Sequence, residues 1–140
     1  MPSSPLSIRF DDVVLERLRR RAAGRDTTPS GLAQRLVDEG LRAQEFPGIV
    51  FRDGSSGRRA GLAAGPDVWE VATALRDSEL SGDAAVEDTA VGLGLGVGRV
   101  RVALAYYGAY PEEIDAEIAE NERAAEEALR SWESQQRLLA

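Results

Sequence analysis

The N-terminal part of the chain contains a short stretch in which apolar and polar residues alternate. Leu6, Ile8 and Phe10 are apolar, and Ser7 and Arg9 lie between them. A period of two is typical of a β-strand with one buried face. Helical patterns follow directly, and a strand without a neighbour leaves backbone donors and acceptors unsatisfied. We therefore expect this strand to pair with the same strand of a second copy, in an antiparallel ribbon that shows Ser7 and Arg9 on its polar face.

Two helical patterns follow the predicted strand. The first begins after Asp11 or Asp12, either of which can cap a helix, and ends at Gly24. The second begins at Thr28-Pro29, where a capping threonine precedes a proline at the first helical position. Each pattern carries one apolar stripe: Val14, Leu15, Leu18 and Ala22 in the first, and Leu32, Ala33, Leu36, Val37, Gly40 and Leu41 in the second. A strand and two helices of about 40 residues bury too small a core alone, so residues 1–45 are predicted to form a dimerisation domain.

Residues 46–110 predict a small β-hairpin followed by three short helices. Phe46-Pro47-Gly48 interrupts the preceding helix, and the segments 49–51 and 59–62 flank a turn-rich stretch. Helices are expected from Gly65-Pro66-Asp67, from Ser81 or Gly82, and from about Val97 to Tyr110. The predicted buried positions are Val68, Val71, Ala72 and Leu75 in the first helix, Ala85, Val86 and Ala90 in the second, and Val100, Leu104 and Tyr107 in the third. This order suggests a helix-turn-helix-like domain that packs or dimerises, with Arg99 and Arg101 as its candidate DNA contacts.

Residues 111–140 predict one long amphipathic helix. Pro111 suits the first helical position, and acidic residues in the next turn suit the positive end of the helix dipole. Apolar residues recur at helical spacing, and those predicted to contact a partner protein are Ile118, Leu129, Trp132 and Leu138. The alternative is that the helix folds back on residues 46–110, and the environment of Trp132 distinguishes the two.

Composition narrows the chemistry that this mainly α architecture can carry. The chain has no cysteine and no histidine, which excludes disulfides, thiolate or imidazole zinc sites and histidine-dependent catalytic triads. Glu112, Glu113 and Asp115 have no converging catalytic group, and the glycine-rich run 91–98 lacks the residues of a phosphate loop. We therefore predict a non-enzyme with no cofactor and no metal. The absence of an apolar segment of about 20 residues and of a leader pattern predicts a cytoplasmic protein.

The charge is unevenly distributed. The net charge is −7, which argues against non-specific coating of nucleic acid by the whole chain. Residues 1–45 hold 8 arginines and 7 acidic residues, whereas residues 111–140 hold 3 arginines and 9 acidic residues. The N-terminal domain is thus compatible with DNA, and the acidic C-terminal helix suits a basic partner.

The order of strand, capped helix, polar turn and helix beginning at Thr28-Pro29-Ser30 resembles the ribbon-helix-helix repressors of the Arc, MetJ and CopG type. The resemblance implies that the paired strands enter the major groove and that Ser7 and Arg9 read base edges. It also implies that the start of the second helix, around Thr28 and Ser30, holds a backbone phosphate. The alternative for Arg9 is a solvated charge that protects a strand edge from aggregation.

Residues 46–110 resemble, more distantly, an uncharacterised domain family of bacterial antitoxins. The similar segments are Pro47-Gly48-Ile49-Val50, Asp67-Val68-Trp69-Glu70 and Ala103-Leu104-Ala105-Tyr106-Tyr107 followed by Pro111-Glu112-Glu113-Ile114, whereas residues 61–65 depart from that family's glycine-rich turn. Together the resemblances imply a VapB-like antitoxin, active as a homodimer or a higher even oligomer. Such a protein represses its own operon on operator DNA and neutralises a toxin, here a PIN-type ribonuclease. The alternative is a stand-alone ribbon-helix-helix regulator whose C-terminal part senses a ligand or oligomerises.

Overall fold

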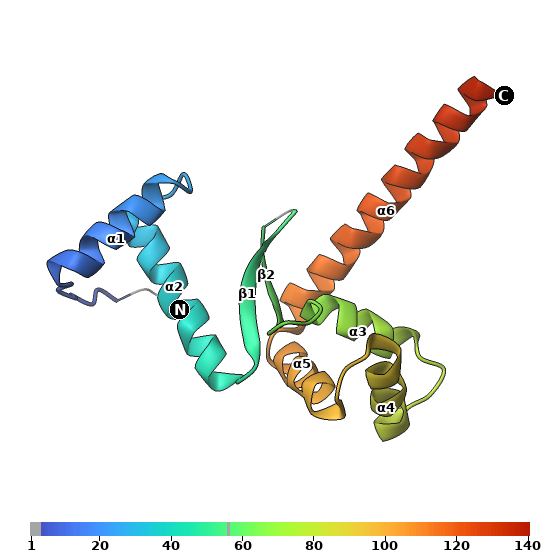
Figure 1. The fold of residues 1–140 in the computed structure, drawn as a ribbon, viewed down its shortest axis with the longest axis horizontal. Coiled ribbons are helices and arrows are strands. Elements are labelled where there is room, and N and C mark those ends of the chain that lie inside the picture. Colours follow the sequence, from blue (N-terminus) through green and yellow to red (C-terminus); the bar gives the residue numbers. More distant parts are fainter. Residues whose placement is uncertain (1–3, 56) are drawn as a thin grey trace. The chain divides into compact units, whose positions relative to one another are not determined.

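A computed structural model describes residues 4–55 and 57–140 (Figure 1). These residues hold six helices and one two-stranded antiparallel sheet, which confirms the predicted mainly helical class. The chain divides into two compact units, Met1–Arg42 and Ala43–Ala140. Within the described ranges, none of the helices combines the length and the apolarity that a membrane span requires.

The first unit contains α1 (Asp12–Ala23) and most of α2 (Pro29–Glu45). The Asp11 carboxylate accepts a hydrogen bond from the Val14 amide at 2.9 Å, and the helix ends at Gly24. The Thr28 hydroxyl accepts one from the Gly31 amide at 3.0 Å. Both predicted helix starts are confirmed. Residues 4–11 form neither helix nor strand in the single chain, so the ribbon, which requires two chains, stays a prediction.

The second unit begins with the end of α2 and a β-hairpin. Strands β1 (Ile49–Gly54) and β2 (Gly57–Leu62) pair antiparallel, in a register that runs from Ile49 opposite Leu62 to Gly54 opposite Gly57. Gly57 has a φ of 136°, which L side chains rarely adopt, so glycine suits the start of β2. The predicted hairpin is therefore confirmed, with longer strands than the apolar segments alone indicate.

Three short helices follow the hairpin: α3 (Val68–Asp77), α4 (Gly82–Leu93) and α5 (Val97–Ala109). Gly94 ends α4 in the left-handed conformation, with φ 66°. Of the residues predicted for α3 and α4, Val68, Val71, Val86 and Ala90 lie in the core, Ala72 and Leu75 pack against it and Ala85 is buried. Val100 is buried and Tyr107 packs against the core, but Leu104 is 40% exposed, so the predicted stripe of α5 is confirmed only in part. Val100, Ala103 and Tyr106 are its buried residues, at steps of three, and they share one helix face.

Tyr106 is the centre of this core. Its ring is fully buried and lies 4.9 Å from the ring of Tyr110, 5.4 Å from Phe46 and 6.3 Å from Phe51, measured between centroids. Its hydroxyl donates to Glu113 Oε2 at 2.8 Å, so the one polar atom of this large side chain has a partner. Tyr106 thus joins the end of α2, the hairpin, α5 and the following helix.

Helix α6 (Pro111–Leu139) packs on the unit only through its first turns (Figure 1). Ile114, Glu117 and Ile118 are buried, whereas residues 121–140 are exposed. The helix therefore folds back on the unit only at its start, and the contact of the projecting remainder with a partner protein stays a prediction. Ile118 is 6% exposed and serves the core, which leaves Leu129, Trp132 and Leu138 as the exposed members of the predicted partner surface.

The packing of α6 generates a stability prediction. Ile114→Ala should lower the free energy of unfolding of the second unit by about 2–5 kcal/mol, because it leaves a cavity among fully buried side chains. Leu138→Ala, at a position 88% exposed, should change it by no more than about 0.5 kcal/mol. Urea unfolding followed by circular dichroism measures both, and equal losses would contradict the described packing.

Candidate functional site

The first unit leaves an apolar face uncovered. In α1 and α2 the buried residues are Ala22 and Leu32. A groove of about 750 Å³ is lined by Val14, Arg17, Leu18, Arg20, Arg21, Leu32 and Leu36. Other large apolar side chains of α2 also remain in solvent, with Val37 54% exposed and Leu41 53% exposed. Exposed apolar surface of this kind is typical of interaction sites, because a monomer gains nothing from exposing it.

The alternating stretch adds to the same unpartnered apolar surface. Leu6 is 81% exposed and Ile8 is 57% exposed, so neither finds a core in the single chain. Ser7 and Arg9 are also exposed, and Arg9 makes no hydrogen bond or ion pair with a described residue. In the single chain, the apolar side chains of this stretch therefore have no core to pack in, and its polar side chains point into solvent.

The start of α2 carries several hydroxyl groups. Thr28 acts as the N-cap, and a side chain in place of Gly31 would lie 3.1 Å from the Thr28 hydroxyl and 3.2 Å from that of Thr27. Ser30 is exposed in the first turn, where free backbone amides and the helix dipole favour an anion. No hydrogen bond or ion pair joins Thr28 or Ser30 to the alternating stretch among the described residues.

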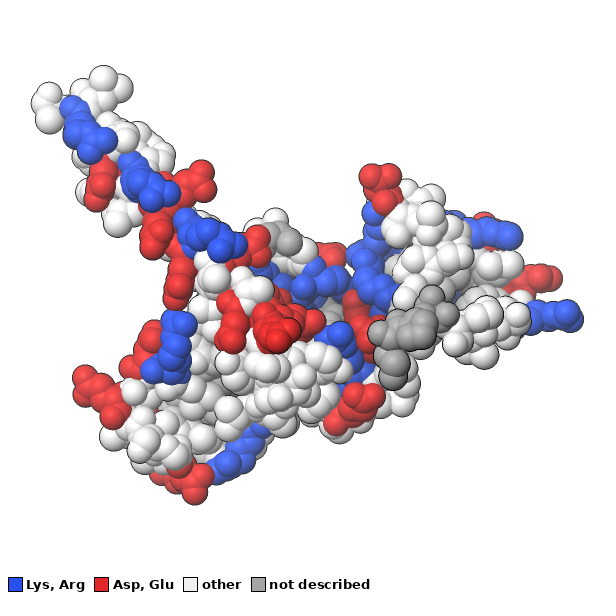
Figure 2. Space-filling view, turned by 180° about the vertical axis from the view of Figure 1, so that it is seen from behind, with Lys and Arg blue, Asp and Glu red and all other residues white. Residues whose placement is uncertain are grey.

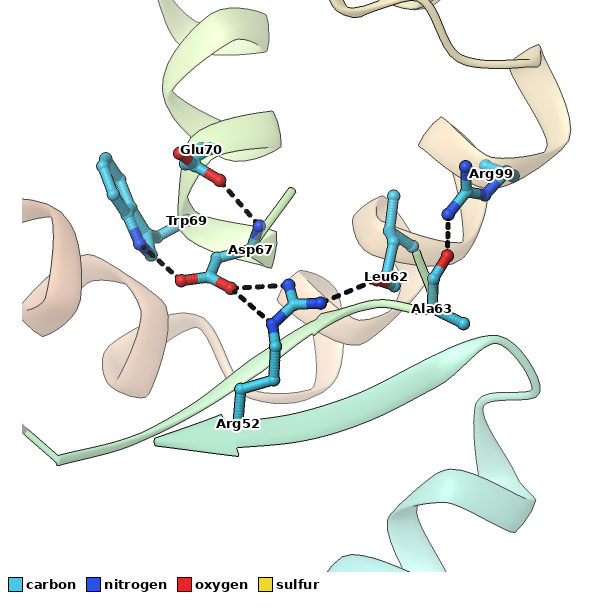
Figure 3. Close-up of polar contacts among 7 residues, drawn as sticks. All are labelled: Arg52, Leu62, Ala63, Asp67, Trp69, Glu70 and Arg99. Carbon is cyan, nitrogen blue, oxygen red and sulfur yellow. Dashed lines mark hydrogen bonds and ion pairs between the residues drawn. The ribbon is translucent and has the colours of Figure 1, made fainter. Parts of the chain in front are cut away.

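The second unit uses its candidate DNA-contacting arginines within its own fold. Arg99 donates to the carbonyl of Ala63 (Figure 3). Arg101 Nη2 lies 2.8 Å from Asp83 Oδ1. These contacts tie α5 to the segment after β2 and to α4. They give both side chains a structural role that the sequence did not reveal.

A polar network around Asp67 joins the hairpin to α3 (Figure 3). Arg52 Nη2 lies 2.7 Å from Asp67 Oδ1, and Arg52 Nη1 donates to the Leu62 carbonyl at 3.1 Å. The Trp69 indole donates to Asp67 Oδ2 at 3.3 Å, and Glu70 accepts from the Asp67 amide at 2.7 Å. Sequence reasoning missed Arg52. The signal was the glycine at position 61 on the neighbouring strand, where a Cβ would collide with the Arg52 guanidinium.

The projecting part of α6 forms the second unpartnered surface. Ala125, Leu129 and Trp132 recur at steps of four and three and share one face, and Trp132 is 56% exposed. Glu126 and Glu133 each follow a residue of this face by one position, about 100° around the helix. The arginines of this part, Arg123, Arg130 and Arg137, each lie two positions before Ala125, Trp132 or Leu139 and therefore on the opposite side. We call the residues Ala125, Leu129, Trp132 and Leu139 the α6 stripe.

The acidic excess of the C-terminal helix lies in its packed N-terminal part, residues 111–120. Residues 111–120 contain five acidic residues and no arginine, whereas residues 121–140 contain four acidic residues and three arginines. Figure 2 shows acidic and basic side chains interspersed along the projecting part. The feature that distinguishes this part is thus an apolar stripe with one acidic edge, and not a high negative charge.

A small cavity lies beside the base of α6. Its volume is about 290 Å³, and it is lined by Val71, Ala72, Leu75, Arg76, Ala103, Leu104, Tyr107, Asp115 and Ile118. Leu104 and Tyr107, predicted as core residues, thus face this cavity. The Tyr107 hydroxyl donates to Asp115 Oδ1 at 2.9 Å, which raises the pKa of the phenol, and Arg76 Nη2 donates to Glu122 Oε1 at 2.9 Å. The cavity therefore has apolar walls and polar groups that already bind one another.

The predicted site residues lie on different units: Ser7, Arg9, Thr28 and Ser30 on the first, and Leu129, Trp132 and Leu138 on the second. In the described ranges, no three acidic side chains gather in a way that could hold a metal ion. Comparison of the chain with protein-family models, with curated proteins and with solved structures gives no match.

The uncovered face of the first unit predicts a dimer that one charge can break. Val37→Glu should raise the dissociation constant of the dimer at least about a hundredfold, because the interface would bury an unpaired carboxylate. The matched control is Ala23→Glu, at an exposed position nine residues after Val14 and therefore on the opposite side of α1, and it should leave the dimer intact. Sedimentation equilibrium measures both constants. A wild-type monomer, or equal effects of the two substitutions, would contradict the interface.

Proposed function

We propose that this chain is the antitoxin of a type II toxin–antitoxin system. It binds operator DNA as a homodimer, represses its own operon and neutralises a partner toxin of the PIN-type ribonuclease class. The observation that carries the proposal is the combination of an uncovered apolar face with an unpaired alternating strand pattern in the first unit. In a two-fold dimer, a second copy of the same unit would cover the apolar face and would also pair with the strand.

Dimerisation would create the DNA-reading surface. Antiparallel pairing of residues 6–10 from two chains places Ser7 and Arg9 of both copies on one face of the ribbon. Arg9 can donate two hydrogen bonds to the O6 and N7 atoms of guanine, which discriminates against other bases by about 1–3 kcal/mol. The start of α2 would hold a phosphate through backbone amides and the hydroxyls of Thr28 and Ser30. A two-fold protein of this kind suits a palindromic operator.

The α6 stripe would bind the toxin. Residues 121–139 extend over about 28 Å as a helix, and an amphipathic helix with an aromatic anchor suits an apolar groove on a partner. Trp132 is the expected anchor, with Leu129 and Leu139 on the same face. Leu138, six positions after Trp132, lies outside the stripe. Because Glu126 and Glu133 form one edge of the stripe, the matching groove should carry basic residues on one rim only.

The cavity beside α6 favours a second candidate function, a stand-alone transcription regulator that senses a small molecule. Apolar walls with a few polar groups are typical of ligand sites. The two functions differ in what the chain binds, a small molecule or a protein. A regulator would show a ligand-dependent rise in melting temperature and no protein partner, whereas an antitoxin would co-purify with the toxin encoded beside it.

The DNA assignment predicts the behaviour of Arg9→Ala. Selection from a random duplex pool with the wild-type chain should yield a palindromic consensus. Arg9→Ala should bind that consensus about ten- to a hundredfold more weakly per chain while remaining a dimer, because it loses a base contact and no core atom. Arg123→Ala, which removes the same charge from the back of α6, should bind as the wild type does. Retained sequence specificity in Arg9→Ala would overturn the assignment.

The toxin assignment predicts the behaviour of a chain that ends at Asn121. This truncation keeps Ile114 and Ile118 and therefore the core of the second unit, but removes the α6 stripe. The truncated chain should bind DNA normally and fail to restore growth when the toxin is expressed. Trp132→Ala should weaken toxin binding by at least about 2 kcal/mol in titration calorimetry. Full rescue by the truncated chain would place toxin binding elsewhere.

A further inference from the structure

A buried carboxylate lies where α6 joins the second unit. Glu117 is 9% exposed, between Ile114 and Ile118 in the packed turns of the helix. Its Oε2 atom is buried and accepts no hydrogen bond from a described residue. An ionised carboxylate in this position is costly, because burial removes water without supplying donors. The proposed DNA and toxin contacts make no use of this side chain.

The charges around Glu117 are mostly negative. Arg59 of β2 favours its ionised form, whereas Asp67, at the start of α3, and Glu113 and Glu120 of α6 oppose it. Arg59 is itself shared: its Nη2 lies 3.8 Å from Glu120 Oε2, and its guanidinium carbon lies 6.0 Å from the centre of the Trp69 ring. The three carboxylates are held by other contacts, Asp67 by Arg52, Glu113 by Tyr106 and Glu120 by Arg59.

We propose that Glu117 is a protonation-dependent latch for α6. When the side chain is neutral, the first turns of the helix pack on β2, α3 and α5. When it is ionised, the buried charge favours an open state in which these turns detach and Glu117 reaches water. The latch therefore sets how firmly the second unit holds the base of the projecting helix.

The direction of the pH dependence follows from burial. Burial raises the pKa of Glu117 from its ordinary value of 4.5 to about 7, against the opposing effect of Arg59. Between these two values the packed state binds more protons than the open state. The stability of the packed turns is therefore full below about pH 4.5, falls as the pH rises toward 7, and stays low above it.

Hydrogen exchange on the full-length chain tests the latch. NMR protection factors of the amides of residues 118–122, corrected for the intrinsic pH dependence of exchange, report the opening of these turns. In the wild type the opening constant should rise by up to about tenfold per pH unit between pH 5 and 7. In Glu117→Gln, which keeps the shape and removes the charge, it should be independent of pH. Glu127→Gln, an exposed position of the same helix, should behave as the wild type does.

A second measurement keeps the test independent of the variants. The ¹³C resonance of the Glu117 carboxyl in the wild-type chain should titrate with a midpoint near 7. A midpoint below about 5, or the same pH dependence of opening in Glu117→Gln and the wild type, would overturn the latch. Neither measurement uses DNA or a toxin, so the outcome is separate from that of the proposed function.

Discussion

The burial of Tyr106 is the interaction on which the second unit depends. One fully buried ring contacts aromatic side chains from the end of α2, from β1 and from the end of α5, and its hydroxyl binds Glu113 on α6. Because four elements meet at this side chain, a two-stranded sheet that would be marginal alone becomes part of a core. The hydrogen bond to Glu113 also ties the first turn of α6 to α5.

The two units differ in how completely they satisfy their own apolar surface. The second unit closes its core around residues such as Val68, Val71 and Val100, all fully buried. The first unit has two capped helices, and the buried residues of these helices are Ala22 and Leu32. This difference locates the expected interactions. In the proposed dimer a second copy would complete the first unit, whereas the second unit has its own core and displays the projecting part of α6. The proposed function, repression together with toxin binding, would use both surfaces, one on each unit.

The packing of α5 and α6 shows why the apolar pattern of the sequence does not by itself predict which residues are buried. Val100, Leu104 and Tyr107 fit the helical spacing as well as Val100, Ala103 and Tyr106 do. The second set is buried because small Ala103 permits close packing and Tyr106 finds a partner for its hydroxyl. In the sequence, Glu117 is one of several acidic residues in the same segment. Only the packing of β2 and α3 against α6 shows that Glu117 is buried.

Local chemistry along the chain determined where helices begin and end, since Asp11, Gly24, Thr28 and Gly94 act through hydrogen bonds and dihedral preferences within a few residues. The hairpin and the mainly helical class followed from the same short-range signals. Tertiary structure alone decided that α6 divides into a packed N-terminal part and a longer projecting part, that its acidic excess lies in the packed part, and that Arg52 and Arg99 serve the fold. These features depend on contacts between residues that are far apart in the sequence. Such contacts determine which side chains are buried and which charges surround them. The predicted ribbon of residues 6–10 would require two chains, because its backbone hydrogen bonds would form between them, and it therefore stays a prediction.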